Sequence, residues 1–331
     1  MKKVMLSLIK HVFEKAIIYQ WYSRLTWLRV MMPLTWLYTF VIKKRLGQQT
    51  AGGYGVPVWT IGNITVGGNG KSPMVAWLIK LMRDRGIQHA VMMRGYGGTS
   101  KKVHRVTASD SALIVGDEAW DLFCQYPDIH LIVSKDRKAA MDYFEEHGQH
   151  LSVIISDDGL QNIAIPNDIV WVCVDQEKGL GNGYCLPVGP MRQPKEALPD
   201  HAKVIYKYGP DDGYSFSLQP LRCRRLSDGL CQPLTYFKNQ TIHALAGIAF
   251  PDQFFNLLRS HGLSIVCYGK SDHADLSQQS FDETFQWMVT TKDAVKLGHV
   301  ANQSNIWVLE TLLKPSVKLQ QLAETTLQTF L

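Results

Sequence analysis

The sequence predicts an α/β protein with mostly parallel sheets, built as a larger and a smaller domain. Short apolar, β-branched runs alternate with helical patterns from about residue 56 to the carboxyl end, which is typical of parallel strands joined by helices. A Gly-rich stretch ending in Lys-Ser separates the first of these runs from the first of these helices. Turn signals between residues 209 and 240 interrupt the alternation and divide it into two segments.

Composition bounds the class of protein. The chain has 331 residues, of which 46% are hydrophobic and 19% charged, which suits a globular protein with a sizeable core. Its net charge of +6 suits an anionic partner, whether nucleotide, nucleic acid or anionic lipid, without choosing among them. The six cysteines include no C-x-x-C pair, so reduced thiols are expected rather than a zinc site or disulfide framework.

Residues 1–46 differ from the rest of the chain. They hold nine basic residues against one acid, Glu14, with six Trp, Tyr and Phe residues among them from Trp21 onward. The longest uncharged run, Val30 to Ile42, is too short for a transmembrane helix, which needs about 20 apolar residues. The pattern predicts an amphipathic helical segment in a membrane interface. The alternative is a pair of helices packed on the domain, and the two interpretations are compatible.

The stretch from Thr60 to Pro73 has the context of a phosphate-binding loop. An apolar run, Val56 to Ile61, precedes it, and a helical pattern with one apolar face follows it. Glycines let successive backbone N–H groups form an anion nest, and the new helix adds the positive end of its dipole. The loop predicts a P-loop NTPase-type domain, although Thr65 stands where the usual G-x-x-x-x-G-K-[ST] pattern has its first glycine.

The residue types of this loop assign its roles. Lys71 can reach the β- and γ-phosphates of ATP, and Ser72 can hold Mg²⁺. The remaining expected nucleotide-binding residues form the nest itself: Gly67, Gly68, Asn69 and Gly70. The alternative, an ordinary Gly-rich turn before Lys-Ser, is less favoured because the flanking strand and helix both fit.

A second motif typical of nucleotide-binding proteins follows the loop along the chain. The β-branched strand Leu151 to Ser156 ends in Asp157-Asp158-Gly159. Carboxylates at this place hold Mg²⁺ directly or through water, so Asp157 and Asp158 are predicted metal-site residues.

Three further residues stand where ligands bind in open α/β sheets but also have plain structural interpretations. Arg94 begins a Gly-rich loop after a strand, and could hold a phosphate or lie in a surface turn. Asp117 starts a helical pattern, where an N-cap is the default. Arg192 lies in a long Gly/Pro-rich loop ending at Pro194, as an anion contact or a solvated side chain.

The chain is predicted to divide consecutively: an interfacial helical segment over 1–46, the P-loop domain over 47–208, a β-hairpin linker over 209–240, and a smaller α/β domain over 241–331. In the linker, Pro233 to Phe237 is expected to be a short strand. In the smaller domain His273 has the surroundings of a structural or solvated histidine. Lys292 and Lys296 are spaced as on one exposed helix face.

These motifs together resemble one family over nearly the whole chain. They are GNITVGGNGKSP, RGYGG, VGDE, SDDGLQ, GNGYCLPVGPMRQP, AGIAFP, the Asp272-His273 pair and TKDAVK. The chain is similar to the tetraacyldisaccharide 4′-kinases, which phosphorylate an acylated glucosamine disaccharide of the lipid A pathway. Even the variant Gly-rich loop has that family's form.

The resemblance implies a function and assigns roles. It implies ATP- and Mg²⁺-dependent phosphorylation of the 4′-hydroxyl of tetraacyldisaccharide 1-phosphate at the cytoplasmic face of a Gram-negative inner membrane. The expected partners are the acylated lipid and an anionic membrane surface, with no nucleic acid. Asp117 and His273 would form a catalytic dyad, in which Asp117 takes the proton and His273 orients it. Lys71 would also serve catalysis, and the residues facing substrate would be Arg94, Gln161 and Arg192.

The sequence also departs from the family pattern. Gln193 stands where the family often has Glu, Asn162 where it often has His, and Thr291 where it often has Glu. A rival interpretation is a membrane-surface ATPase switch of the partition type. Proteins of that class usually have a second lysine early in the loop, at the place that Val66 occupies here.

Overall fold

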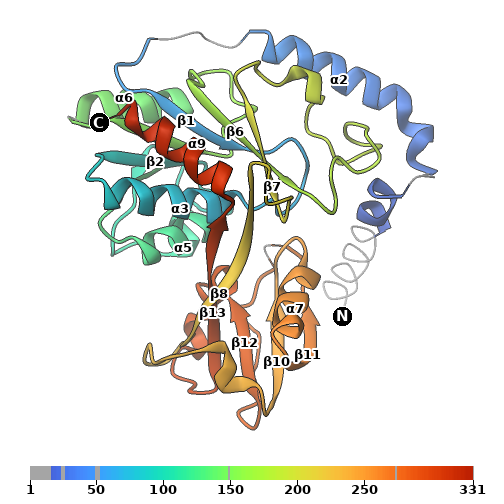
Figure 1. Ribbon diagram of the computed structural model, residues 1–331, viewed down its shortest axis with the longest axis vertical. Helices are drawn as coiled ribbons and strands as arrows, with labels where there is room; N and C mark the ends of the chain where they lie inside the picture. Colours follow the sequence, from blue (N-terminus) through green and yellow to red (C-terminus); the bar gives the residue numbers. More distant parts are fainter. Residues whose placement is uncertain (1–15, 24–26, 49–52, 148–149, 273, 331) are drawn as a thin grey trace. The chain divides into compact units, whose positions relative to one another are not determined.

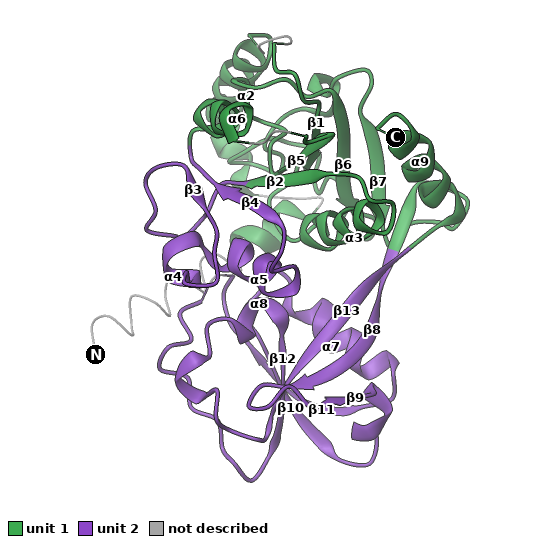
Figure 2. Cartoon of the chain, turned by 90° about the vertical axis from the view of Figure 1, so that its left-hand side faces the viewer, with its two compact units in different colours: residues 1–92, 136–216, 315–331 green, residues 93–135, 217–314 purple. Residues whose placement is uncertain are grey.

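The computed structural model describes residues 16–23, 27–48, 53–147, 150–272 and 274–330 (Figure 1). The chain divides into two compact units (Figure 2). Unit 1 is Met1–Met92, Asp136–Phe216 and Pro315–Leu331, and unit 2 is Met93–Lys135 and Ser217–Lys314. The units therefore interleave along the sequence. The consecutive division expected from the sequence follows turn signals and composition, whereas the units follow spatial contacts.

Unit 1 is built on a parallel sheet in the order β7-β6-β1-β5-β2. Its strands are β1 (Val58–Gly62), β2 (His89–Met93), β5 (Val153–Asp157), β6 (Ile169–Asp175) and β7 (Lys203–Lys207). The start of β8 (Ser215–Arg225) pairs in parallel with β7. Every residue of β1 and β5 is buried, as expected of central strands covered on both faces.

Unit 1 also holds the helices α2 (Met32–Leu46), α3 (Lys71–Asp84), α6 (Arg137–His147) and α9 (Val317–Gln328), with short 3₁₀ turns η1 (Trp27–Met31) and η2 (Lys195–Ala197). Of these, α3 contacts β1 and β5. Trp59 of β1 lies at the centre of the core. Its ring packs edge-on against Trp171, with centroids 4.7 Å apart, and lies 6.2 Å from the ring of Phe330.

Within unit 2 the strands pair in parallel in the order β11-β10-β12-β13. These strands are β10 (Thr241–Ala246), β11 (Ser264–Gly269), β12 (Gln286–Thr290) and β13 (Ile306–Pro315). Short antiparallel pairs join β3 (His104–Arg105) to β4 (His130–Val133) and β8 to β9 (Cys231–Gln232). The helices are α4 (Ala112–Val115), α5 (Asp117–Gln125), α7 (Pro251–Ser260) and α8 (Thr291–Ala294), with 3₁₀ turns η3 (Leu234–Phe237) and η4 (Gly298–Val300).

The α/β fold class is confirmed, and one local expectation is wrong. Residues 234–237 form the 3₁₀ turn η3 and not a strand. Leu234 and Phe237 are both buried while Tyr236 between them is exposed, and a spacing of three suits a 3₁₀ turn rather than the alternation of a strand.

Helix α2 presents its apolar side chains outward. Its packed face carries Thr35, which is buried and whose hydroxyl accepts a hydrogen bond from Val188 N, and Tyr38, whose hydroxyl donates to Arg192 O. The exposed apolar side chains are Leu34, Trp36, Leu37, Phe40 and Val41. This polarity is the reverse of that on a surface helix of a globular protein. Within the described residues, no helix combines the length and the hydropathy that crossing a bilayer requires.

Candidate active site

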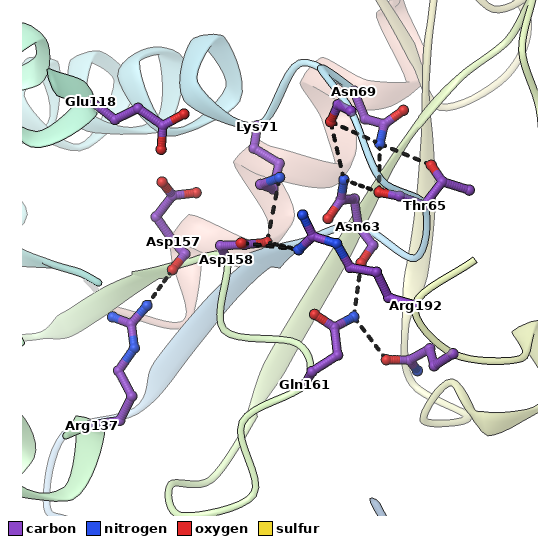
Figure 3. A network of polar contacts seen from close by, with 12 residues as sticks. Asn63, Thr65, Asn69, Lys71, Glu118, Arg137, Asp157, Asp158, Gln161 and Arg192 are labelled. Atoms are coloured by element: carbon purple, nitrogen blue, oxygen red, sulfur yellow. Dashed lines mark hydrogen bonds and ion pairs between the residues drawn. The ribbon is translucent and has the colours of Figure 1, made fainter. Parts of the chain in front are cut away.

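The Gly-rich loop runs from the end of β1 to the start of α3. Gly70 is the N-cap of α3 and has φ +86°, and a Cβ there would lie 2.5 Å from the Phe216 ring. Asn69 Nδ2 donates to Thr65 Oγ1 over 3.0 Å, and Asn63 Nδ2 donates to Thr65 O over 2.7 Å (Figure 3). Thr65 therefore supplies acceptors that tie the loop together, and because its φ is not positive its backbone does not require a glycine.

Two cations meet one carboxylate beside this loop. Lys71 Nζ lies 3.4 Å from Asp158 Oδ1, and Arg192 Nη1 donates to both Asp158 oxygens over 3.0 Å (Figure 3). Burial alone would raise the pKa of Asp158, but Lys71 and Arg192 outweigh it and the pKa is lowered. Asp158 is thus held ionised directly after β5.

Asp157, the last residue of β5, is buried, and its backbone carbonyl accepts a hydrogen bond from Arg137 Nη2 over 2.6 Å. Ser72 lies exposed in the first turn of α3. The structure thus places both acids and both loop residues, Lys71 and Ser72, on unit 1, with Lys71 and Asp158 in direct contact.

A chain of amides joins three segments near the loop. Gln161 Nε2 donates to Asn63 O and to Gln193 Oε1, each over 2.9 Å, and Gln193 Nε2 donates to Ala197 O. Gln193 is 1% exposed, so its role in the structure is that of a buried connector. The sequence did not single out Asn63, and its only signal was an amide directly after the strand.

The remaining predicted residues belong to unit 2. Arg94 is exposed in the loop after β2. Asp117 is the first residue of α5, and the N-cap is Gly116, so the default interpretation of Asp117 as the N-cap is wrong. Asp117 is buried, and its Oδ2 lies 3.2 Å from Lys296 Nζ. His273 lies outside the described residues.

A model of the tetraacyldisaccharide-1-P 4′-kinase family matches residues 27–330 of the chain. The chain belongs to this family. It is 37% identical over 309 residues to the tetraacyldisaccharide 4′-kinase of Pseudomonas fluorescens strain Pf0-1, covering 89% of this chain and 91% of that protein. It is also 37% identical over 308 residues to that of Azotobacter vinelandii, covering 89% and 92%.

The family fold is also seen in a solved structure. The structure of LpxK from Aquifex aeolicus in complex with ATP superposes with a TM-score of 0.75, covering 92% of this chain and 99% of that chain at 23% identity. At this identity the likeness supports the fold alone. Family membership and the shared fold confirm the α/β architecture that the sequence predicts.

The oxygen donors of unit 1 fit the Mg²⁺ that a kinase of this family uses. Ser72, Asp157 and Asp158 offer one hydroxyl and two carboxylates, which are hard ligands suited to Mg²⁺. In the part of the chain that the structure describes, no group of three or more His, Cys, Asp and Glu could hold a metal by itself. Mg²⁺ is typically bound through one or two carboxylates, substrate phosphates and water.

Proposed function

We propose that this chain transfers the γ-phosphoryl group of ATP to the 4′-hydroxyl of tetraacyldisaccharide 1-phosphate, giving the 4′-phosphorylated lipid A precursor. The observation that carries the proposal is the contact of Lys71 with Asp158 and of Asp158 with Arg192, at the carboxyl end of a parallel sheet and beside a Gly-rich loop. Phosphoryl transfer depends mainly on positioning and neutralisation of charge, which such an arrangement of cations and carboxylates supplies.

The nucleotide is assigned to unit 1. The backbone amides of residues 67–70 and the N-terminus of α3 would hold the phosphates of ATP, and Lys71 would neutralise the transferred group. Ser72, Asp157 and Asp158 would hold Mg²⁺, which supplies charge neutralisation on the phosphate oxygens when bound. Arg192 and Gln161 are assigned to the substrate side of the same unit.

The acceptor chemistry is assigned to unit 2. Asp117 would accept the proton of the 4′-hydroxyl, with His273 orienting it, and Arg94 would bind an anionic part of the substrate. Asp117 is suited to this role because it begins α5 and its carboxylate is held by a neighbouring lysine rather than capping the helix.

The lipid substrate requires a membrane contact, for which we propose α2. Its outward apolar face includes Trp36 and Phe40, and Lys43, Lys44 and Arg45 follow in its last turn. Aromatic side chains favour the headgroup level, and each basic residue near anionic lipid contributes about 1 kcal/mol. The cytoplasmic face of the inner membrane, where ATP is present, is the proposed location.

The test is a transfer assay with γ-labelled ATP, Mg²⁺ and tetraacyldisaccharide 1-phosphate in detergent micelles. Label is expected in the lipid and is expected to disappear in Lys71→Ala. Label released only as free phosphate would contradict the kinase proposal and favour an ATPase switch.

A further inference from the structure

Lys292 has no role in the function proposed above, and Lys296 enters it only through its contact with Asp117. From the sequence alone, Lys292 and Lys296 could be an exposed pair on one helix face. In the structure α8 ends at Ala294, so Lys296 lies in the turn that follows. Both side chains are largely covered: Lys292 is 19% exposed and Lys296 is 14% exposed. Covered lysines need anionic partners, and both have them.

Lys292 joins two separate segments of unit 2. Its Nζ lies 3.1 Å from Glu118 Oε1 in the first turn of α5, and 3.3 Å from Asp272 Oδ1. Burial alone would lower the pKa of Lys292, but Glu118, Asp272 and Asp117 outweigh it and the pKa is raised. The ammonium group is therefore held charged between two carboxylates.

Lys296 makes a parallel connection. Its Nζ lies 3.2 Å from Asp117 Oδ2 and 3.5 Å from Ala274 O. Asp272 and Ala274 are the two chain neighbours of position 273. Each lysine therefore joins the first turn of α5 to one side of that position.

The short helix that carries Lys292 is itself fixed. The Thr290 hydroxyl caps α8 by accepting from Asp293 N, and Asp293 Oδ2 accepts from Gly247 N over 2.9 Å. Thr291 Oγ1 donates to Asp121 Oδ2 on α5 over 3.2 Å. Asp293 is fully buried, so these contacts form a rigid base for the two lysines.

We propose that Lys292 and Lys296 are positioning residues that hold Asp117, the proposed proton acceptor, in one fixed arrangement with Asp272 and Ala274. Lys296 orients the Asp117 carboxylate through a charge-assisted hydrogen bond, and Lys292 fixes Asp272 to Glu118. The inference rests on the proposed function, because it assigns these lysines to the same phosphoryl transfer. A displacement of about 1 Å in a reacting group can cost about a hundredfold in rate, which sets the scale of the effect.

The test begins with Lys292→Met and Lys296→Met, which keep the apolar stem and remove the charge. Each is expected to lower kcat about tenfold to a hundredfold, by the same argument from misplacement, while the affinity for ATP stays as in the wild type. Lys292→Arg and Lys296→Arg are expected to recover most of the rate. Lys238→Met, an exposed lysine of the same unit, is the matched control and should leave kcat unchanged.

A double-mutant cycle separates a positioning role from a general structural one. In an Asp117→Asn background, Lys296→Met is expected to cost little further rate, because the carboxylate on which it acts is gone. Wild-type kcat in Lys296→Met would overturn the proposal. So would a double variant in which the fold-losses in kcat of Lys296→Met and Asp117→Asn simply multiply. If Lys296→Met does not fold, as judged by its thermal midpoint, Lys296→Gln replaces it in the same cycle. Wild-type turnover in Asp117→Asn alone would instead contradict the proposed proton acceptor, so the two failures are distinguishable.

Discussion

Lys71 Nζ lies 3.4 Å from Asp158 Oδ1, which joins the start of α3 to the residue directly after β5. Arg192 approaches the same carboxylate from a loop 34 residues further along the chain. One ionised aspartate thus holds two cations in place beside the Gly-rich loop. Because Asp158 must be ionised to hold both cations, the stability of this site depends on pH. It also depends on the backbone geometry of the Gly-rich loop.

Asp158→Asn should lower stability only where Asp158 is ionised. The folded-state pKa of Asp158 is lowered, so its contribution is present above the unfolded value of about 3.9 and is lost as pH falls through the folded value. The thermal midpoint of the variant should lie below that of the wild type at pH 6–8, and the gap should close below about pH 4. A gap that persists at the lowest pH would show that the carboxylate's charge is not what matters.

Asp121→Asn should change stability in the opposite direction. Burial raises the pKa of Asp121 to about 6, against hydrogen bonds from Gln125 and Thr291 and the charge of Lys292, which lower it. Its contribution to stability is full below about pH 4 and is lost as pH rises through about 6. The variant should therefore be more stable than the wild type at pH 8, by up to about 3 kcal/mol, and equal to it near pH 4. Urea unfolding at the two pH values measures this, and equal midpoints at pH 8 would contradict it.

Gly70→Ala should impair nucleotide binding more than it impairs folding. A Cβ at Gly70 would lie 2.5 Å from Phe216 Cζ, so the loop must shift. The KM for ATP is expected to rise about tenfold or more, since misplaced loop amides lose phosphate contacts. Gly86→Ala is the control, because Gly86 also has positive φ but has no atom within 4 Å of the added Cβ. If the KM for ATP rose equally in both variants, backbone strain alone would account for the weaker ATP binding.

Gln193→Glu should destabilise unit 1 at neutral pH. The amide that donates to Ala197 O would be replaced by a carboxylate oxygen facing a carbonyl oxygen in a buried site. The expected cost is about 1–3 kcal/mol at pH 8, and less at pH 5, where a protonated carboxyl can donate. Gln193→Leu, which cannot titrate, should show no such pH dependence. A Glu variant as stable as the wild type at pH 8 would mean that the Gln161 contact alone suffices.

Replacing the outward aromatic residues of α2 should weaken membrane binding. Trp36→Ser with Phe40→Ser removes two exposed side chains, each worth about 2 kcal/mol when buried in lipid. Partitioning onto vesicles that contain anionic lipid should fall more than tenfold, while turnover of substrate in detergent micelles changes little. Leu230→Ser, an exposed apolar residue of unit 2, should leave vesicle binding as it is. Unchanged binding in the double variant would remove α2 from the proposed contact.

The sheets were predictable from the sequence because the strands are short, apolar and separated by glycines or helical patterns. The places of Lys71 at the start of a helix and of Asp157 and Asp158 at the end of a strand were predictable because the flanking residues show both elements. The assignment of residues 93–135 to unit 2 was not predictable, since neither composition nor turn signals change there.

Contacts between distant segments were not predictable from the sequence for a related reason. Lys296 and Asp117 are 179 positions apart by residue number, and nothing in their local patterns marks them as partners. The sequence predicted a membrane-interface segment here, but not which side of α2 packs on the protein, because apolar residues lie all round the helix and nothing marks Thr35 and Tyr38 as its packed face. The hydrogen bonds that Thr65 accepts from Asn63 and Asn69 were likewise not predictable from the loop pattern.

The carboxyl-terminal helix α9 belongs to the unit that begins the chain, and Phe330 lies beside Trp59 in its core. The core around β1 is therefore closed by a residue that follows Trp59 by 271 positions. A polypeptide that holds β1 and the Gly-rich loop but lacks residues 315–331 would have an open core in unit 1. Removing residues 315–331 would accordingly act on the interior around β1 and, through it, on the strand that carries the Gly-rich loop.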